Sequence, residues 1–108
     1  MRKLIAILIT ALISLPATAE EVVFTSQVTR VYPFGNGTFV ITLQESSPSC
    51  TRTDNYYHVK VGENGVTQEG LQLMFSAALA ALASGKNVSI FFDSSSSNCY
   101  INRLSINR

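Results

Sequence analysis

The chain has 108 residues and a formal net charge of +1, with eight Lys or Arg residues against seven Asp or Glu residues. The basic residues beyond position 19 are scattered, which excludes the clustered basic face typical of nucleic-acid binders. The length suffices for one hydrophobic core and excludes two. We therefore expect a single domain with no nucleic-acid partner.

Residues 1–19 have the pattern of a secretory signal peptide, with a basic Arg-Lys pair, an apolar stretch over 4–15 and an Ala-Thr-Ala cleavage site at 17–19. The apolar stretch is short for a bilayer span, so we expect cleavage and no membrane span in the mature chain. The mature domain, residues 20–108, then keeps six basic and seven acidic residues, a net charge of −1. The sequence predicts a secreted or periplasmic protein.

The mature chain opens with two predicted strands. Residues 22–32 are rich in β-branched and aromatic residues, and their imperfect alternation predicts a strand with a bend or bulge. Residues 33–37 have turn chemistry, since the Asn36-Gly37 pair adopts positive φ at low cost. Residues 38–43 alternate again, and the two strands predict a hairpin.

A polar loop over 45–55 contains Cys50 and leads into a third predicted strand over 56–61. In this strand Tyr57 and Val59 lie on one face. Tyr56, His58 and Lys60 alternate with them on the other face. The pattern is that of a half-buried strand.

Residues 67–86 predict the chain's clearest helix, capped by Thr67 and ended by Gly85. Its interior consists mainly of Leu, Met, Phe and Ala, which lose little freedom in a helix. Residues with helical spacing predict the face that packs on the core: Leu71, Met74, Phe75, Ala78, Leu79 and Leu82.

The opposite helix face carries small or weakly polar side chains: Gln72, Ser76, Ala80 and Ala83. A solvated helix face normally carries charged residues. We therefore expect these four residues to lie against a second copy of the chain in a homo-oligomer.

After the helix, residues 87–92 predict a strand, 93–98 a polar loop and 99–106 a last strand. The order βββαββ is that of the OB fold, a small five-stranded barrel of mainly β structure with one helix. A plain α+β sheet with a helix on one face is the competing architecture.

Cys50 and Cys99 form an even pair in an exported chain, which predicts one disulfide. Closing this long loop would stabilise the domain by about 4 kcal/mol in the chain-entropy model. A redox or metal role is disfavoured because the sequence has no C-x-x-C and only one His. We predict no metal site and no cofactor.

Five features follow one another along the chain: a hairpin, a Cys in the next loop, a helix that ends at 84–86, a strand at 87–90 and a second Cys in the segment 99–101. This succession resembles small exported bacterial proteins similar to the OB-fold B subunits of subtilase and pertussis-like toxins. The resemblance implies a subunit of a five-membered ring that binds host-cell glycans, with any catalytic partner unknown. The nearest counterparts of the family's sialic-acid-contacting serine are Ser26 and Thr29.

Aromatic side chains are the residues best suited to a glycan, because a ring packs on the C–H face of a sugar while a phenol bonds its rim. OB folds bind through strands two and three and the loops between strands one and two and four and five, here 33–37 and 93–98. An ordinary place in the barrel core or surface is the alternative for each ring. The predicted ligand residues are Ser26, Thr29, Tyr32, Phe34, Asn36, Tyr56, Tyr57 and Tyr100.

The function that we predict is that of a non-catalytic binding and assembly module. The alternative is a secreted or periplasmic inhibitor or accessory protein that contacts another protein through a strand edge or the polar loops. A small hydrolase is the weakest option: His58 is the only imidazole, no motif pairs it with a nucleophile, and a structural histidine is expected.

Overall fold

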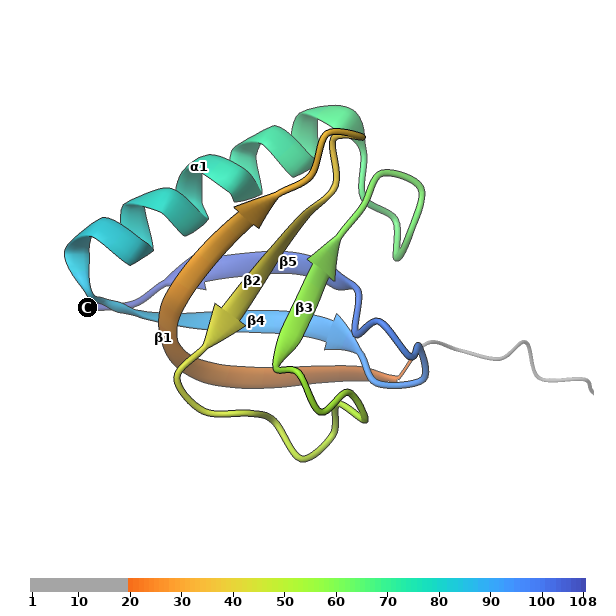
Figure 1. The fold of residues 1–108 in the computed structure, drawn as a ribbon, viewed down its shortest axis with the longest axis horizontal. Helices are drawn as coiled ribbons and strands as arrows, with labels where there is room; N and C mark the ends of the chain where they lie inside the picture. The colour runs from red at the N-terminus through yellow and green to blue at the C-terminus, as the bar shows by residue number, and fades with distance from the viewer. Residues whose placement is uncertain (1–19) are drawn as a thin grey trace, which may run out of the picture.

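The computed structural model describes residues 20–108, so the predicted signal peptide lies outside the described part of the chain. Five strands and one helix follow in the predicted order βββαββ, and Figure 1 shows the helix lying along one side of a curled sheet. The elements are β1 (Glu21–Pro33), β2 (Phe39–Leu43), β3 (Tyr56–Val59), α1 (Gln68–Ser84), β4 (Asn87–Asp93) and β5 (Ile101–Ile106). The predicted fold class is confirmed.

The long strand β1 belongs to both halves of the sheet. Its first half pairs with β4 and its second half with β2, all antiparallel, in the order β3-β2-β1-β4-β5. The register shifts between Val28 and Arg30, which confirms the bulge predicted from the imperfect alternation. The resulting bend, plain in Figure 1, curls the sheet until β3 lies near β5.

Side chains tie the β3 end of the sheet to β5. The Asn64 Nδ2 atom donates to the Tyr100 carbonyl over 2.9 Å, and the Asn102 Nδ2 atom donates to the Asn64 carbonyl over 2.6 Å. No backbone ladder joins β3 and β5 within residues 20–108. The barrel is therefore closed by amide side chains at this seam.

Helix α1 has the ends that the sequence predicts. The Thr67 hydroxyl accepts a hydrogen bond from the Gly70 N–H over 3.0 Å, and Gly85 ends the helix in the left-handed region with φ of 69°. The predicted core face is partly wrong, because Leu79 and Leu82 are 43% and 39% exposed whereas Ala81 is fully buried.

The stripe that faces the sheet is Leu71, Met74, Ala78 and Ala81. The helix packs against β1 and β5, and small alanines allow its backbone to approach these strands closely. Burial of the alanine stripe rotates Leu79 and Leu82 to the flank of the helix.

The predicted disulfide between Cys50 and Cys99 is present, with the two Cα atoms 5.9 Å apart. It joins the loop before β3 to the residues that precede β5. Beneath it the Tyr57 and Phe92 rings meet edge to face, with centroids 5.5 Å apart, in the centre of the core.

Candidate ligand-binding site

Five rings form a continuous row over the surface from the β1–β2 loop to the start of β5. Phe34 stacks on Tyr32 with ring centroids 5.0 Å apart, and Tyr32 lies 6.3 Å from Tyr56. Tyr56 lies 6.4 Å from His58, which meets Tyr100 edge to face at 6.2 Å. We call this arrangement the aromatic row. Strands β1 and β3 and the flanking loops place it there because these residues share the outward phase of their strands.

One side of the aromatic row borders a hollow of about 270 Å³, the aromatic hollow. The β1–β2 loop and the β4–β5 loop form opposite walls, and β3 forms the floor. Its lining residues are Phe34, Asn36, Thr38, His58, Lys60, Asn98 and Tyr100. This lining combines three rings with amide, hydroxyl and ammonium groups and includes no carboxylate, so it favours a polar ligand with exposed C–H faces.

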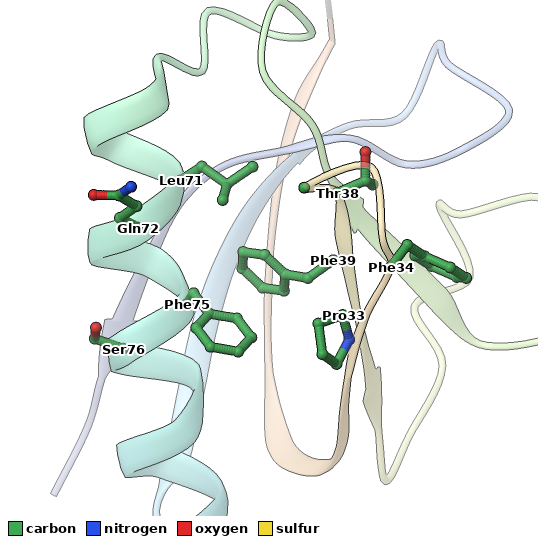
Figure 2. A pocket seen from close by; sticks show the side chains of 9 residues that line it. Pro33, Phe34, Thr38, Phe39, Leu71, Gln72, Phe75 and Ser76 are labelled. Atoms are coloured by element: carbon green, nitrogen blue, oxygen red, sulfur yellow. The ribbon is translucent and has the colours of Figure 1, made fainter.

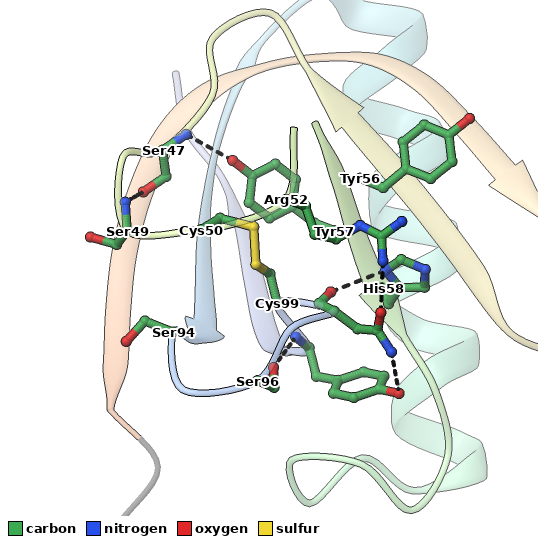
Figure 3. The surroundings of a disulfide bond; sticks show 12 residues. Ser47, Ser49, Cys50, Arg52, Tyr56, Tyr57, His58, Ser94, Ser96 and Cys99 are labelled. Atoms are coloured by element: carbon green, nitrogen blue, oxygen red, sulfur yellow. Dashed lines mark hydrogen bonds between the residues drawn. A yellow bond between two sulfur atoms is a disulfide. The ribbon is translucent and has the colours of Figure 1, made fainter. Parts of the chain in front are cut away.

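Asn98 connects three of the surrounding groups through hydrogen bonds. Its Oδ1 atom accepts from the Arg52 Nη1 atom over 2.7 Å, and its Nδ2 atom donates to the Tyr100 hydroxyl over 2.9 Å. Its backbone carbonyl lies 3.0 Å from the His58 Nδ1 atom. The next residue, Cys99, is held by the disulfide. Figure 3 shows Arg52 and His58 near the disulfide between Cys50 and Cys99. The β4–β5 wall of the hollow is therefore attached to β3 and to the loop before it.

Arg52 is itself oriented by Asp54. The Arg52 Nε atom donates to the Asp54 carboxylate over 2.9 Å, and this bond lowers the pKa of Asp54 to about 2 and raises the pKa of Arg52. The guanidinium carbon also lies 6.0 Å from the centre of the Tyr56 ring. The ion pair fixes the guanidinium between the aromatic row and Asn98.

His58 is half-buried, and desolvation lowers its pKa despite the opposing hydrogen bond to Asn98. A carbonyl oxygen only accepts hydrogen bonds, so the proton of neutral His58 resides on Nδ1. Within residues 20–108 the ring has no nucleophile or acidic partner hydrogen-bonded to it, so this site offers no triad geometry.

Most of the predicted ligand residues lie together. Tyr32, Phe34, Tyr56 and Tyr100 belong to the aromatic row, and Asn36 lines the aromatic hollow. These residues are far apart in the sequence, and the curl of the sheet brings them together.

Tyr57 lies elsewhere, because its ring is completely buried and its hydroxyl accepts a 2.8 Å hydrogen bond from the Ser47 N–H. Burial raises the pKa of Tyr57, against the effect of that bond. Its phase with the buried Val59 is the sequence signal that marks it as a core residue.

Ser26 and Thr29 also lie outside the aromatic hollow. Ser26 is buried and its hydroxyl accepts from the Glu45 N–H over 3.1 Å, whereas Thr29 is exposed at the β1 bulge with its hydroxyl 2.7 Å from that of Thr42. Ser26 borders a different, polar hollow of about 220 Å³. Neither residue shares a hollow with the aromatic row.

Sequence reasoning did not assign ligand roles to Thr38, Lys60, His58 or Asn98, which complete the hollow. Lys60 and His58 alternate with the buried β3 residues, so their outward direction was readable from the strand pattern. The position of Asn98 beside them depends on closure of the barrel.

A second, apolar groove of about 350 Å³ lies between α1 and the β1–β2 loop. Figure 2 shows the Phe39 and Phe75 rings next to each other, with centroids 5.2 Å apart, and Phe34 on the β1–β2 loop. The helix contributes Leu71, Gln72, Phe75 and Ser76 to its lining. The groove therefore adjoins the helix face for which the sequence predicts self-association.

That helix face is exposed at all four predicted positions, Gln72, Ser76, Ala80 and Ala83. Leu73, which the sequence reasoning did not include, is 73% exposed beside them. Among the described residues, a small-residue helix face is thus open to solvent and is flanked by the exposed side chains of Leu73 and Leu79.

Within residues 20–108, no three His, Cys, Asp or Glu side chains are placed to hold a metal ion together. In the same part of the chain, no helix has the length and apolar character needed to cross a bilayer.

Comparison with known proteins gives a match at the level of the fold. No family model matches the sequence, and no curated protein sequence matches it. Among solved structures, the fold is similar to that of human heat-labile enterotoxin in complex with a blood group A antigen analogue. The two share 10% sequence identity with a TM-score of 0.61, over 82% of this chain and 86% of the enterotoxin chain. The expected likeness to toxin proteins is thus found in the fold.

Proposed function

We propose that this protein is an exported, non-catalytic module that binds carbohydrate through the aromatic hollow and assembles with copies of itself. The observation that carries the proposal is the aromatic row beside the two OB-fold loops, on a fold similar to that of an enterotoxin bound to a blood group antigen analogue. The buried disulfide supports export, since such bonds persist in oxidising compartments.

The chemistry of the hollow supports a sugar ligand. Phe34, Tyr100 and His58 offer faces for the C–H surface of a pyranose, and Asn36 and Lys60 supply polar groups at its rim. The Asn36 Oδ1 atom already accepts from the Thr38 N–H over 3.0 Å, so its amide N–H₂ is the end left for a ligand. With donors in excess and no carboxylate in its lining, the hollow suits sugars that carry acceptor groups such as a carboxylate or an acetamide.

The experiment is a glycan array with the oxidised protein, residues 20–108. Lys60→Met removes the ammonium group of the hollow, and Lys86→Met, at an exposed position after the helix, is the matched control. We expect selective glycan binding that Lys60→Met weakens several-fold and Lys86→Met leaves unchanged. No binding to any glycan, or equal loss in the two variants, would contradict the carbohydrate site.

Self-association is proposed through the helix face of Gln72, Ser76, Ala80 and Ala83. Its exposure, the exposed Leu73 beside it and the adjoining apolar groove support a contact with a second copy, and a ring of five is the assembly that the toxin-subunit resemblance implies.

Analytical ultracentrifugation tests this contact. Ala80→Arg should dissociate the oligomer while leaving the folded monomer, whereas Ser105→Arg, on the exposed outer side of β5, should not. A wild-type protein that is monomeric at micromolar concentration would remove the assembly proposal. If such a monomer also binds no glycan and captures one protein from the secreted fraction, the inhibitor or accessory function takes its place.

A further inference from the structure

We propose that Asn98 is the positioning residue of the aromatic hollow: it makes Tyr100 a hydrogen-bond donor and His58 an acceptor, so that the pair selects a ligand hydroxyl group. This inference rests on the proposed carbohydrate function and names the group that the site recognises. Asn98 itself makes three internal bonds, through both ends of its amide and through its backbone carbonyl.

The direction of the Tyr100 hydroxyl follows from a chain of fixed donors and acceptors. Asp54 orients the guanidinium of Arg52, which can only donate, so the Asn98 atom that faces it must be the amide oxygen. The amide nitrogen then faces Tyr100 and donates to its oxygen. The Tyr100 O–H proton is left to point away from Asn98, which makes this phenol a donor to a ligand.

The polarity of His58 is fixed by the same residue. Its Nδ1–H donates to the Asn98 carbonyl, so Nε2 of the neutral ring carries a lone pair and accepts. No residue among those described, 20–108, bonds Nε2. The side chain of Asn98 therefore sets the direction of the Tyr100 O–H bond, and its backbone carbonyl sets which nitrogen of His58 carries the proton.

The two groups are neighbours in the hollow, with ring centroids 6.2 Å apart and both rings in its lining. A hydroxyl group both accepts and donates, so it can accept from Tyr100 and donate to Nε2 at once. An ether oxygen or an O-methyl group satisfies only the first partner and leaves the second without a bond, which weakens binding.

The first test is free of ligand. Nitrogen-15 NMR of the oxidised protein above pH 8 should show neutral His58 with the proton on Nδ1. A proton on Nε2 in the wild type would overturn the inference even if glycans bind, so its failure is distinct from failure of the carbohydrate function.

The second test uses Asn98→Asp, which keeps the size of the side chain and the acceptor for Arg52. Its carboxylate accepts the Tyr100 O–H, so the phenol can no longer donate to a ligand. We expect binding of the strongest array glycan to fall at least about tenfold with the His58 tautomer and thermal stability preserved. The O-methyl analogue of the recognised hydroxyl should bind the wild type with a similar loss.

Tyr100→Phe should match the loss in Asn98→Asp, because both remove the same donor. Lys86→Met, at an exposed position outside the hollow, changes the net charge by the same amount as Asn98→Asp and is the control. Wild-type affinity in Asn98→Asp would overturn the inference, as would an equal loss in Lys86→Met. If no glycan on the array binds, the carbohydrate function fails. The tautomer measurement then still decides whether Asn98 makes the Nε2 atom of His58 an acceptor.

Discussion

The two loops that wall the aromatic hollow are held in different ways. In the β1–β2 loop the hydrogen bonds are internal: Phe34 N–H to the Thr38 carbonyl over 2.7 Å, and Gly37 N–H to the Phe34 carbonyl over 3.1 Å. The β4–β5 loop is attached to distant segments, through the disulfide to Cys50 and through Asn98 to Arg52. One wall is therefore a self-contained turn, and the other is fixed by the rest of the domain.

A composition typical of mobile loops therefore does not show how firmly a loop is held in the fold. Ser94 illustrates this, since its N–H donates to the Glu20 carbonyl over 2.9 Å and ties a serine-rich loop to the start of the domain. Changes that remove an attachment of the fixed wall should therefore affect global stability, while changes in the self-contained wall should affect mainly ligand binding.

Loss of the disulfide should have the largest effect. Replacing Cys50 and Cys99 with Ser removes a cross-link over a sequence separation of 49 and should lower the free energy of unfolding by about 4 kcal/mol. Urea denaturation followed by circular dichroism measures the loss. A variant within about 1 kcal/mol of the oxidised wild type would show that the hydrogen bonds of this wall fix it without the disulfide.

Tyr57→Phe should come next, because the Tyr57 hydroxyl anchors the loop that carries Cys50. It removes the acceptor for the Ser47 N–H, which is buried, and should cost about 1–3 kcal/mol of stability. Tyr56→Phe, at a half-buried position in the aromatic row, is the control and should unfold at nearly the wild-type urea concentration. Equal stability of the two variants would mean that the Ser47 N–H finds another partner.

A smaller effect is expected from Asp54→Asn, and it should depend on pH. The pKa of Asp54 in the fold is about 2, below the reference value of 3.8, so the ionised form contributes stability above pH 4 that is lost as pH falls toward 2. For this partly exposed pair the loss at pH 7 should be at most about 1 kcal/mol. Unfolding curves from pH 2 to 7 should converge at the acid end; a constant difference would exclude the ion pair as the cause.

The smallest change in stability is expected for Phe34→Ala in the self-contained wall. The ring is 41% exposed, and the loop's backbone bonds do not involve it, so the free energy of unfolding should change by less than about 0.5 kcal/mol. Glycan binding should nevertheless weaken, because Phe34 lines the hollow. Val23→Ala, at an exposed position of β1 outside the hollow, is the control, and a large loss of stability in Phe34→Ala would abolish the distinction between the walls.

The sequence predicts well the features that depend on neighbouring residues. The Thr67 cap, the Gly85 helix end and the bulge in β1 are local signals, and each is found in the structure. The rotation of α1 that exposes Leu79 was not predictable from spacing alone. It results from how closely the small Ala78 approaches the sheet, which is a property of tertiary packing.

The aromatic hollow shows the same division. Alternation in β3 places His58 and Tyr56 on the outward face, so part of the floor follows from the sequence. The bond between Arg52 and Asn98 joins residues 46 positions apart and forms only when the curled sheet brings β3 to β5. No local pattern encodes that distance, and the positioning role of Asn98 therefore emerges only in the folded domain.

The attachment of the β4–β5 loop has a consequence for binding kinetics. A loop that orders upon binding loses chain entropy in that step, of the order of 1 kcal/mol for each residue fixed. Here the disulfide and Asn98 restrict the loop when the domain folds. Ligand association should therefore proceed in a single fast phase, with differences in affinity among ligands arising mainly from their dissociation rates.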